Sequence, residues 1–340
     1  MRRYLPLGVG FLLIGFGLLY YAWTQYPAWK VSQEGAFAWK NTEELQRIVL
    51  KSADGNKMEL VKQQGGWKIN GKYAPKADAL QALLEVLQRV EYLYPVPKAA
   101  HDHVVRELLT ESIVVELYTT DQQPVKKYWV GGATLDGKGT YMLLERNGKP
   151  ASRPYITYIP GFRGYLTTRY QPDEAGWRSR QIFALQPEQI QEMRLIYPAD
   201  SQRSFIIVQP RPGQFDLKPI TESFRIADTP THRYIRQYLG VFENIHAEAF
   251  SPDNSSKDSL KQTTPWCHFL VTDTTGKQTR LALYRMPVMK RTKSVQTDAT
   301  GGEYDGDRFY FWLNDTDFGI LQYYVWGKTF RKYNDFFFKP

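Results

Sequence analysis

The sequence predicts an α+β fold in which an N-terminal transmembrane helix precedes two duplicated units. Three observations support this prediction: an uncharged apolar run at residues 5–23, a repeated order of strand-like runs, and one amphipathic helix in each repeat. Each unit should be mainly antiparallel sheet with one principal packing helix. The expected parts are a cytoplasmic n-region (1–4), a signal anchor (5–23), a linker (24–40), and two repeat domains (41–185 and 186–340).

The first expected element is the apolar run, which directly follows Arg2 and Arg3. A helix of this length spans about 28 Å, close to the thickness of a bilayer core. The arginines favour the cytoplasmic side, so we expect a single-pass protein of the cytoplasmic membrane with most of the chain in the periplasm. A cleaved signal peptide has a shorter apolar region and small residues after it. The residues expected to form the anchor are Leu5, Leu7, Phe11, Leu12, Leu13, Ile14, Phe16, Leu18, Leu19 and Trp23.

The strand-like runs that open each repeat alternate in polarity or are rich in β-branched residues, and turn residues bound them. Residues 43–50, 58–61 and 65–69 form the first set, and residues 188–196, 204–208 and 213–217 form the second. The offset between the two sets stays near 150 residues, about the size of one domain. This regularity indicates an internal duplication joined around residues 184–188.

One helix is expected next in each repeat. In the first, Leu80, Leu83, Leu84 and Leu87 recur at helical spacing. In the second, Ile235, Tyr238, Leu239 and Phe242 make the apolar face. Further strands should follow at 113–118, 125–130, 141–145 and 155–159 in the first repeat, and at 266–272, 279–284 and 308–313 in the second.

The motifs of the first repeat resemble a known family. These are Gly65-Gly66-Trp67-Lys68-Ile69, the helix that begins Ala77-Asp78, Trp129-Val130-Gly131-Gly132, and Tyr155-x-Thr157-Tyr158. With the N-terminal apolar run, they resemble the envelope proteins catalogued as domain of unknown function 4340. Members often carry Tyr-Gly-Leu after the first helix, whereas this chain has residues 105–110 there. The resemblance implies a neighbourhood of ABC-2 type export components and assigns no catalytic residue.

Composition narrows the classes of function. The 340 residues carry a net charge of +9 without an arginine-rich run or an RNA-binding signature, so nucleic acid is not expected as a partner. Cys267 is the single cysteine, which excludes an intramolecular disulfide, and it is expected to be a small buried hydrophobe. The sequence has no Gly-x-Ser-x-Gly, His-Glu-x-x-His or Cys-x-x-Cys motif, so we expect no enzyme and no cofactor.

Two clusters could hold a metal, although no metal site is predicted. Asp298, Glu303, Asp305 and Asp307 alternate with glycines and could supply oxygen ligands to Ca²⁺, but the EF-hand spacing is absent and a flexible hairpin loop is the other interpretation. His101 and His103 flank Asp102. Two such histidines could ligate one ion only from a loop, and a solvated helix start is the favoured interpretation.

Two surfaces are candidates for partners. Lys290, Arg291 and Lys293 precede the acidic run, and they fit either a solvated loop or docking onto a charged partner or headgroup. The aromatic residues of the first repeat could line one sheet face, or could pack the core: Trp129, Tyr141, Tyr155, Tyr158 and Tyr165. The aromatic residues at 323–326 and 336–338 likewise fit core closure or a docking site.

These observations favour a non-enzymatic, membrane-anchored envelope protein that acts as an accessory or scaffold for an export (ABC-2 type) or surface-assembly complex. The alternative is a periplasmic glycan- or peptide-binding module that uses the sheet aromatics. The expected partners are the membrane and envelope or transporter proteins.

Overall fold

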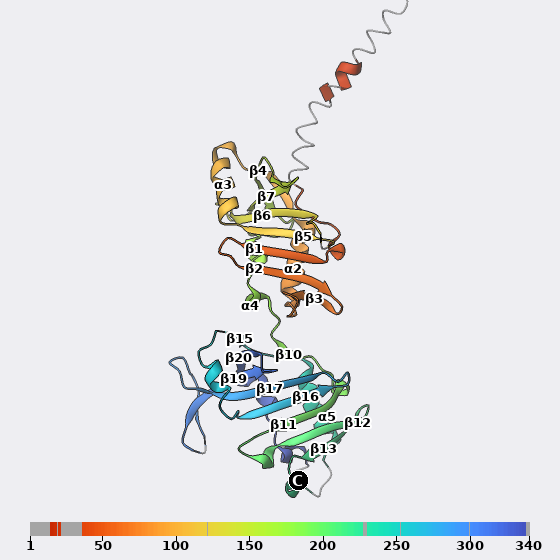
Figure 1. Ribbon diagram of the computed structural model, residues 1–340, viewed down its shortest axis with the longest axis vertical. Helices are drawn as coiled ribbons and strands as arrows, with labels where there is room; N and C mark the ends of the chain where they lie inside the picture. Colours follow the sequence, from red (N-terminus) through yellow and green to blue (C-terminus); the bar gives the residue numbers. More distant parts are fainter. Residues whose placement is uncertain are drawn as a thin grey trace, which may run out of the picture. The chain divides into compact units, whose positions relative to one another are not determined.

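The computed structural model describes residues 14–18, 20–21, 36–120, 122–226, 230–251, 253–298 and 300–337. The chain divides into two compact units between Ser179 and Arg180. Each unit is built on one nine-stranded sheet whose strands pair antiparallel (Figure 1).

The sheet of the first unit has the strand order β3-β2-β1-β5-β6-β7-β9-β4, with β8 paired to β7. Its strands are β1 (Arg47–Ser52), β2 (Lys57–Gln63), β3 (Gly66–Ile69), β4 (Glu91–Pro95), β5 (Ile113–Tyr118), β6 (Lys126–Ala133), β7 (Thr140–Arg146), β8 (Lys149–Pro150) and β9 (Tyr155–Tyr158). Its helical elements are η1 (Thr42–Glu44), α2 (Ala77–Arg89), α3 (Lys98–Thr110), η2 (Thr167–Arg169) and α4 (Glu174–Trp177).

Two helices pack on the first sheet, each through an apolar stripe. The expected helix is α2, which buries Leu83 and Leu87 in the main core of the unit. A second helix, α3, adds to the one principal helix expected in this repeat, although a helix start was one interpretation of residues 101–103, and it buries Val104 and Leu108 against Leu143 in a separate cluster. Because β7 contributes Leu143 to this cluster and Met142 to the main core, the sheet is buried on both faces.

The sheet of the second unit repeats this order as β13-β12-β11-β16-β17-β19-β20-β15, with β18 paired to β19. Its strands are β11 (Ile190–Ile196), β12 (Phe205–Arg211), β13 (Gln214–Pro219), β15 (Ala249–Phe250), β16 (Cys267–Asp273), β17 (Gln278–Pro287), β18 (Val295–Thr297), β19 (Glu303–Leu313) and β20 (Asp317–Gln322), and a separate pair joins β10 (Gln181–Phe183) to β14 (Ile245–His246). Its helical elements are η3 (Pro187–Gln189), η4 (Ser201–Arg203), η5 (Glu222–Phe224), α5 (His232–Leu239), η6 (Gly240–Glu243), α6 (Lys257–Leu260), α7 (Tyr323–Trp326), η7 (Gly327–Thr329) and η8 (Tyr333–Phe336).

The C-terminal aromatic residues of the second unit close its core. Trp326, Phe336 and Phe337 are buried in the same cluster as Phe269 of β16. Tyr324 points away from this cluster and is 93% exposed. The core-closure interpretation is therefore confirmed for Trp326, Phe336 and Phe337, while Phe338 lies outside the described residues.

The fold class expected from the sequence is wrong. The described chain is mostly antiparallel sheet with few short helices, and short strands of two or three residues, β8, β15 and β18, enlarge both sheets. Among the described residues, no helix is long and apolar enough to cross a membrane. The longest helices, α2 and α3, have 13 residues each and span about 20 Å, short of the ~30 Å hydrocarbon core.

The expected anchor at 5–23 must be corrected accordingly. Of its residues, the structure describes 14–18 and 20–21, where Ile14, Phe16 and Leu18 are exposed to 62%, 70% and 65%. The remaining expected anchor residues lie outside the described residues: Leu5, Leu7, Phe11, Leu12, Leu13, Leu19 and Trp23.

Lys126 forms hydrogen bonds to the segment at residues 36–38, which precedes the first strand of the first unit. Its Nζ donates to the carbonyl oxygens of Ala36 (2.6 Å) and Ala38 (2.7 Å), beside the buried ring of Phe37. Burial lowers the pKa of Lys126 to about 8. A neutral amine can keep both hydrogen bonds, because it still carries two N–H donors.

We expect this lysine to make the protein more stable as the pH rises from about 8 to about 10.5. In this range the unfolded chain holds a proton on Lys126 that the folded chain has released, so the free energy of unfolding increases with pH. Urea unfolding measures the free energy of unfolding of wild type and of Lys126→Met. Across this pH range, the wild-type value should rise by about 1–3 kcal/mol more than that of the variant. A difference that stays flat across this range would contradict the shifted pKa.

Candidate functional site

The candidate site is an arm in the second unit, formed by residues 288–302 between β17 and β19. The equivalent connection of the first unit, between β6 and β7, consists only of residues 134–139. The arm contains its own strand, β18, which pairs with β19 in the register Val295–Asp305 and Thr297–Glu303. The second unit thus carries a structured insertion on the shared topology.

The outer surface of the arm combines positive charge with apolar side chains. Lys290, Arg291 and Lys293 are all exposed, and none of them forms an ion pair with any residue that the structure describes. Val288, Met289 and Val295 lie beside them in the chain and are 41%, 45% and 50% exposed. Free cations next to exposed apolar groups are typical of a surface that binds an anionic partner.

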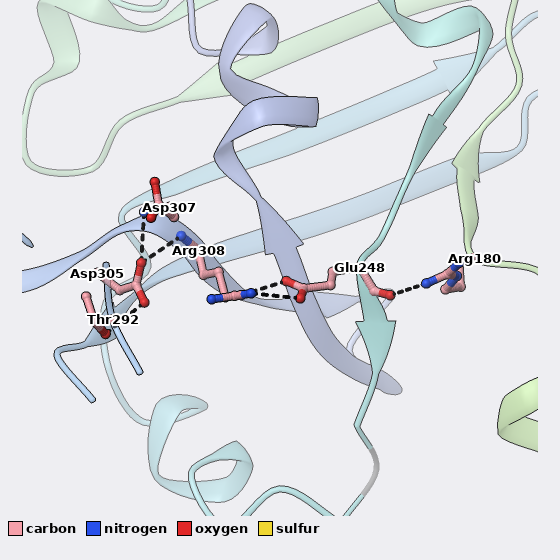
Figure 2. A network of polar contacts seen from close by, with 6 residues as sticks. All are labelled: Arg180, Glu248, Thr292, Asp305, Asp307 and Arg308. Carbon is pink, nitrogen blue, oxygen red and sulfur yellow. Dashed lines mark hydrogen bonds and ion pairs between the residues drawn. The ribbon is translucent and has the colours of Figure 1, made fainter. Parts of the chain in front are cut away.

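A buried carboxylate holds the arm at its base. Asp305 is 2% exposed, and its Oδ2 accepts a hydrogen bond from Thr292 Oγ1 at 2.9 Å (Figure 2). Its Oδ1 accepts from the backbone N–H groups of Asp307 (2.8 Å) and Arg308 (3.2 Å). Thr292 Oγ1 in turn accepts from the N–H of Met289, so the turn that carries Lys290 and Arg291 is tied to β19.

The contacts of Arg308 extend this network to the start of the unit. Its guanidinium donates to both carboxylate oxygens of Glu248, at 2.9 and 3.2 Å, and the backbone carbonyl of Glu248 accepts from Arg180 at 2.6 Å (Figure 2). The hydrogen bond to Glu248 raises the pKa of Arg308, so the guanidinium stays charged. A bidentate pair fixes orientation as well as distance, so it gives the base of the arm a defined geometry.

The far end of the arm is ordered by Asp298. Its Oδ1 accepts from the N–H groups of Thr300 and Gly302, each at 2.9 Å, and its Oδ2 accepts from Arg285 at 3.0 Å. Hydrogen bonds from Thr300 and Gly302 lower the pKa of Asp298. Gly301 has φ +85, a conformation that side chains other than glycine rarely adopt, so the turn requires a glycine there.

The four acidic candidates for calcium do not form a common site. Asp298 and Asp305 use their carboxylates in the hydrogen bonds above, and Glu303 and Asp307 are exposed side chains. Within the described parts of the chain, no group of three or more His, Cys, Asp or Glu residues is placed to hold a metal ion. The geometry gives the calcium interpretation no support.

The two histidines of the first unit lie on helix α3 and have different surroundings. His101 Nδ1 lies 2.9 Å from Asp102 Oδ1 and its Nε2 lies 3.1 Å from the carbonyl oxygen of Ser152. His103 is exposed, and its Nε2 lies 4.0 Å from Glu107. The interpretation as a solvated helix start fits this arrangement.

The aromatic candidates of the first unit are not gathered on one face. Tyr155 is fully buried and packs edge-to-face with Phe37 and Tyr92. Trp129 and Tyr141 pack against the cluster under α3, while Tyr165 is 44% exposed. The geometry therefore does not provide the shared sheet surface that the glycan- or peptide-binding alternative needs.

The sequence located the cations of the arm but not the groups that hold it. Thr292 and Asp305 are 13 positions apart, and Glu248 and Arg308 are 60 positions apart. No local pattern joins such residues, since only the pairing of strands brings them together. The one usable signal was the length of the segment between the predicted strands at 279–284 and 308–313.

No protein-family profile, curated protein or solved structure matches this chain. The resemblance to the domain of unknown function 4340 family stays a prediction.

Proposed function

We propose that this protein is a non-enzymatic accessory or scaffold of the cell envelope that docks onto an anionic partner through the arm. The resemblance supports a place beside an export (ABC-2 type) or surface-assembly complex, at the cytoplasmic membrane and with both units in the periplasm. One observation carries the proposal: an insertion in only one of two units of equal topology presents Lys290, Arg291 and Lys293 on a fixed base.

The way the arm is held favours recognition of a partner. Loops that carry function are often positioned by a rigid scaffold. Here the buried Asp305 and the bidentate Arg308–Glu248 pair orient the turn before a partner arrives. Less conformational entropy is then lost on binding, which strengthens association.

The buried thiol also supports a non-enzymatic role. Cys267, the single cysteine of the chain, is fully buried, as its apolar neighbours predicted. Burial raises the pKa of its thiol well above the ordinary value, so little of the nucleophilic thiolate forms. From the start of β16, it packs in the same core cluster as the aromatic residues of this unit.

Charge reversal of the arm should abolish partner recovery without unfolding the protein. We expect Lys290→Glu, Arg291→Glu and Lys293→Glu together to lower recovery of crosslinked partners about tenfold or more, because repulsion replaces attraction. The measurement is in-cell crosslinking of the full chain, purification from solubilised membranes and mass spectrometry. Since all three side chains are exposed and unpaired within the described residues, the melting temperature should stay within about 2 °C.

A matched control distinguishes an effect of the arm residues from an effect of the net charge of the protein. Arg211→Glu, Lys218→Glu and Lys277→Glu change three exposed cations of the same unit by the same amount. This control should recover the same partners as wild type. Equal recovery by the arm variant and the control would contradict the proposed function.

A further inference from the structure

A cleft in the second unit lies outside the arm network. It has a volume of about 400 Å³ and is lined by side chains of α5, of η6 and of the C-terminal segment that contains η7 and η8. Its apolar surface includes Tyr238, Val241 and the buried Phe336. The volume falls within the range of pockets that hold small ligands.

The walls of the cleft are fixed by contacts between the two segments. Tyr238 donates its hydroxyl to the carbonyl oxygen of Thr329 at 3.0 Å, and the rings of Tyr238 and Phe336 pack at 5.3 Å. The carbonyl oxygen of Arg331 accepts from the Tyr197 hydroxyl at 3.1 Å. A ligand would therefore meet a preformed surface.

Four polar side chains of the lining are free among the described residues. Lys328 and Arg331 form no ion pair there, and the Tyr234 hydroxyl and the Gln237 amide have no hydrogen-bond partner there. Asp335 is the acidic residue of the lining, and its carboxylate accepts from the backbone N–H of Lys332 at 2.9 Å. The cleft is thus positive, with spare donors beside an aromatic ring.

We propose that this cleft binds a uronate, a sugar residue that bears a carboxylate. The guanidinium of Arg331 presents the paired donors that suit a carboxylate, and Lys328 adds a second positive charge. The exposed ring of Tyr234, 40% accessible, can stack on the apolar face of a sugar ring. The Gln237 amide can donate to and accept from sugar hydroxyls.

The combination of groups distinguishes this ligand from a simple anion. Inorganic phosphate would use the two cations and leave the tyrosine and the glutamine without a role. A neutral sugar would use the ring and the amide but leave two cations in the cleft unpaired. A uronate engages all four groups at once. This inference does not rest on the arm or on the proposed function.

Calorimetric titration of the full chain tests the uronate proposal. Trigalacturonate is the probe, and maltotriose is the neutral comparison. We expect trigalacturonate to bind with a Kd below about 1 mM and maltotriose to bind at least about tenfold more weakly. Arg331→Gln should weaken trigalacturonate binding about tenfold, and Tyr234→Ala about fivefold, since a lost charged or stacking contact has effects of this size. Lys218→Gln, an exposed cation of the same unit outside the lining, should change nothing.

Three outcomes would overturn the inference: no binding of trigalacturonate at about 5 mM, equal binding of maltotriose, or equal competition by inorganic phosphate. Binding that disappears in the Lys290→Glu, Arg291→Glu, Lys293→Glu variant would place the polyanion on the arm and would also overturn it. Loss of binding in Arg331→Gln together with full binding in the arm variant supports the uronate proposal. This result does not depend on whether the arm docks a partner.

Discussion

Replacing Trp326 by alanine should lower the free energy of unfolding by about 3–5 kcal/mol, the usual cost of removing a buried tryptophan. Its side chain is fully buried and packs on Phe183 and Phe269, with ring centroids 6.4 and 6.0 Å away. Its Nε1 donates to the carbonyl oxygen of His246 at 2.8 Å, so the substitution also removes the donor of a partly buried hydrogen bond. Urea unfolding of the full chain, followed by circular dichroism, measures the loss.

The same helix supplies the control. Tyr324 lies two residues before Trp326 in α7 and is 93% exposed, so Tyr324→Ala should change the free energy of unfolding by less than about 0.5 kcal/mol. If neither variant lost stability, the C-terminal segment would not close the core. Comparable losses in both variants would mean that Tyr324 also packs in the core, which would contradict its exposed position.

Replacing Asp305 by alanine should release the arm while the sheet stays folded. The substitution removes the acceptor of Thr292 and of two backbone N–H groups. Unpaired buried donors of this kind cost about 1–3 kcal/mol. Local opening at the arm should therefore become about 30-fold more frequent, as about 2 kcal/mol implies. Limited trypsin digestion measures it directly, since Lys290, Arg291 and Lys293 are cleavage sites within the arm.

Two comparison variants make this result specific. Asp305→Asn keeps an oxygen that can accept from Asp307 and Arg308, so its cleavage rate should rise less than about fivefold. Asp307→Ala removes an exposed side chain and leaves its backbone N–H in place, so trypsin should cleave this variant at the wild-type rate. An unchanged rate in Asp305→Ala would show that the buried carboxylate does not hold the arm.

Local sequence patterns predicted the parts of the fold that are themselves local. The spacing of Leu80, Leu83, Leu84 and Leu87 was sufficient to predict α2, because a helix forms its hydrogen bonds within its own segment. For helix α3 only a helix start at residues 101–103 was considered and no packing helix was predicted, because the run at 98–110 begins with mostly small, polar and charged residues and buries only Val104 and Leu108. An apolar stripe that narrow gives little periodic signal.

The strands at the margins of the sheets were harder to predict. Strand β15 has two residues, Ala249 and Phe250, and pairs with Ile320 and Gly319 of β20. A two-residue strand has no alternation to detect, and Gly319 has no side chain to contribute to one. Such strands exist because a neighbouring strand offers them hydrogen-bond partners, which the sequence of the segment itself does not contain.

In the candidate site, too, local features could be predicted and features that depend on distant residues could not. A cluster of charges such as Lys290, Arg291 and Lys293 is visible in the sequence, because exposed cations need no partner. The burial of a single acid such as Asp305 is not visible in the sequence, since its exposed neighbour Asp307 is the same residue type. Regular alternation would put both carboxylates on one face of β19, but the pairing of β17 with β19 is irregular between Tyr304 and Phe309. Local sequence does not show this irregularity, which lets one carboxylate turn inward while the other stays exposed.

The arm joins two strands that are already adjacent and antiparallel, as the short turn at 134–139 joins their counterparts in the first unit. Antiparallel neighbours need only a few linking residues, so the sheet itself imposes no particular length on this connection. Its length and charge can therefore drift over generations while the strand order is kept. One of the two units can then preserve the ancestral scaffold while the other acquires specificity, so that new partners are gained without a new fold.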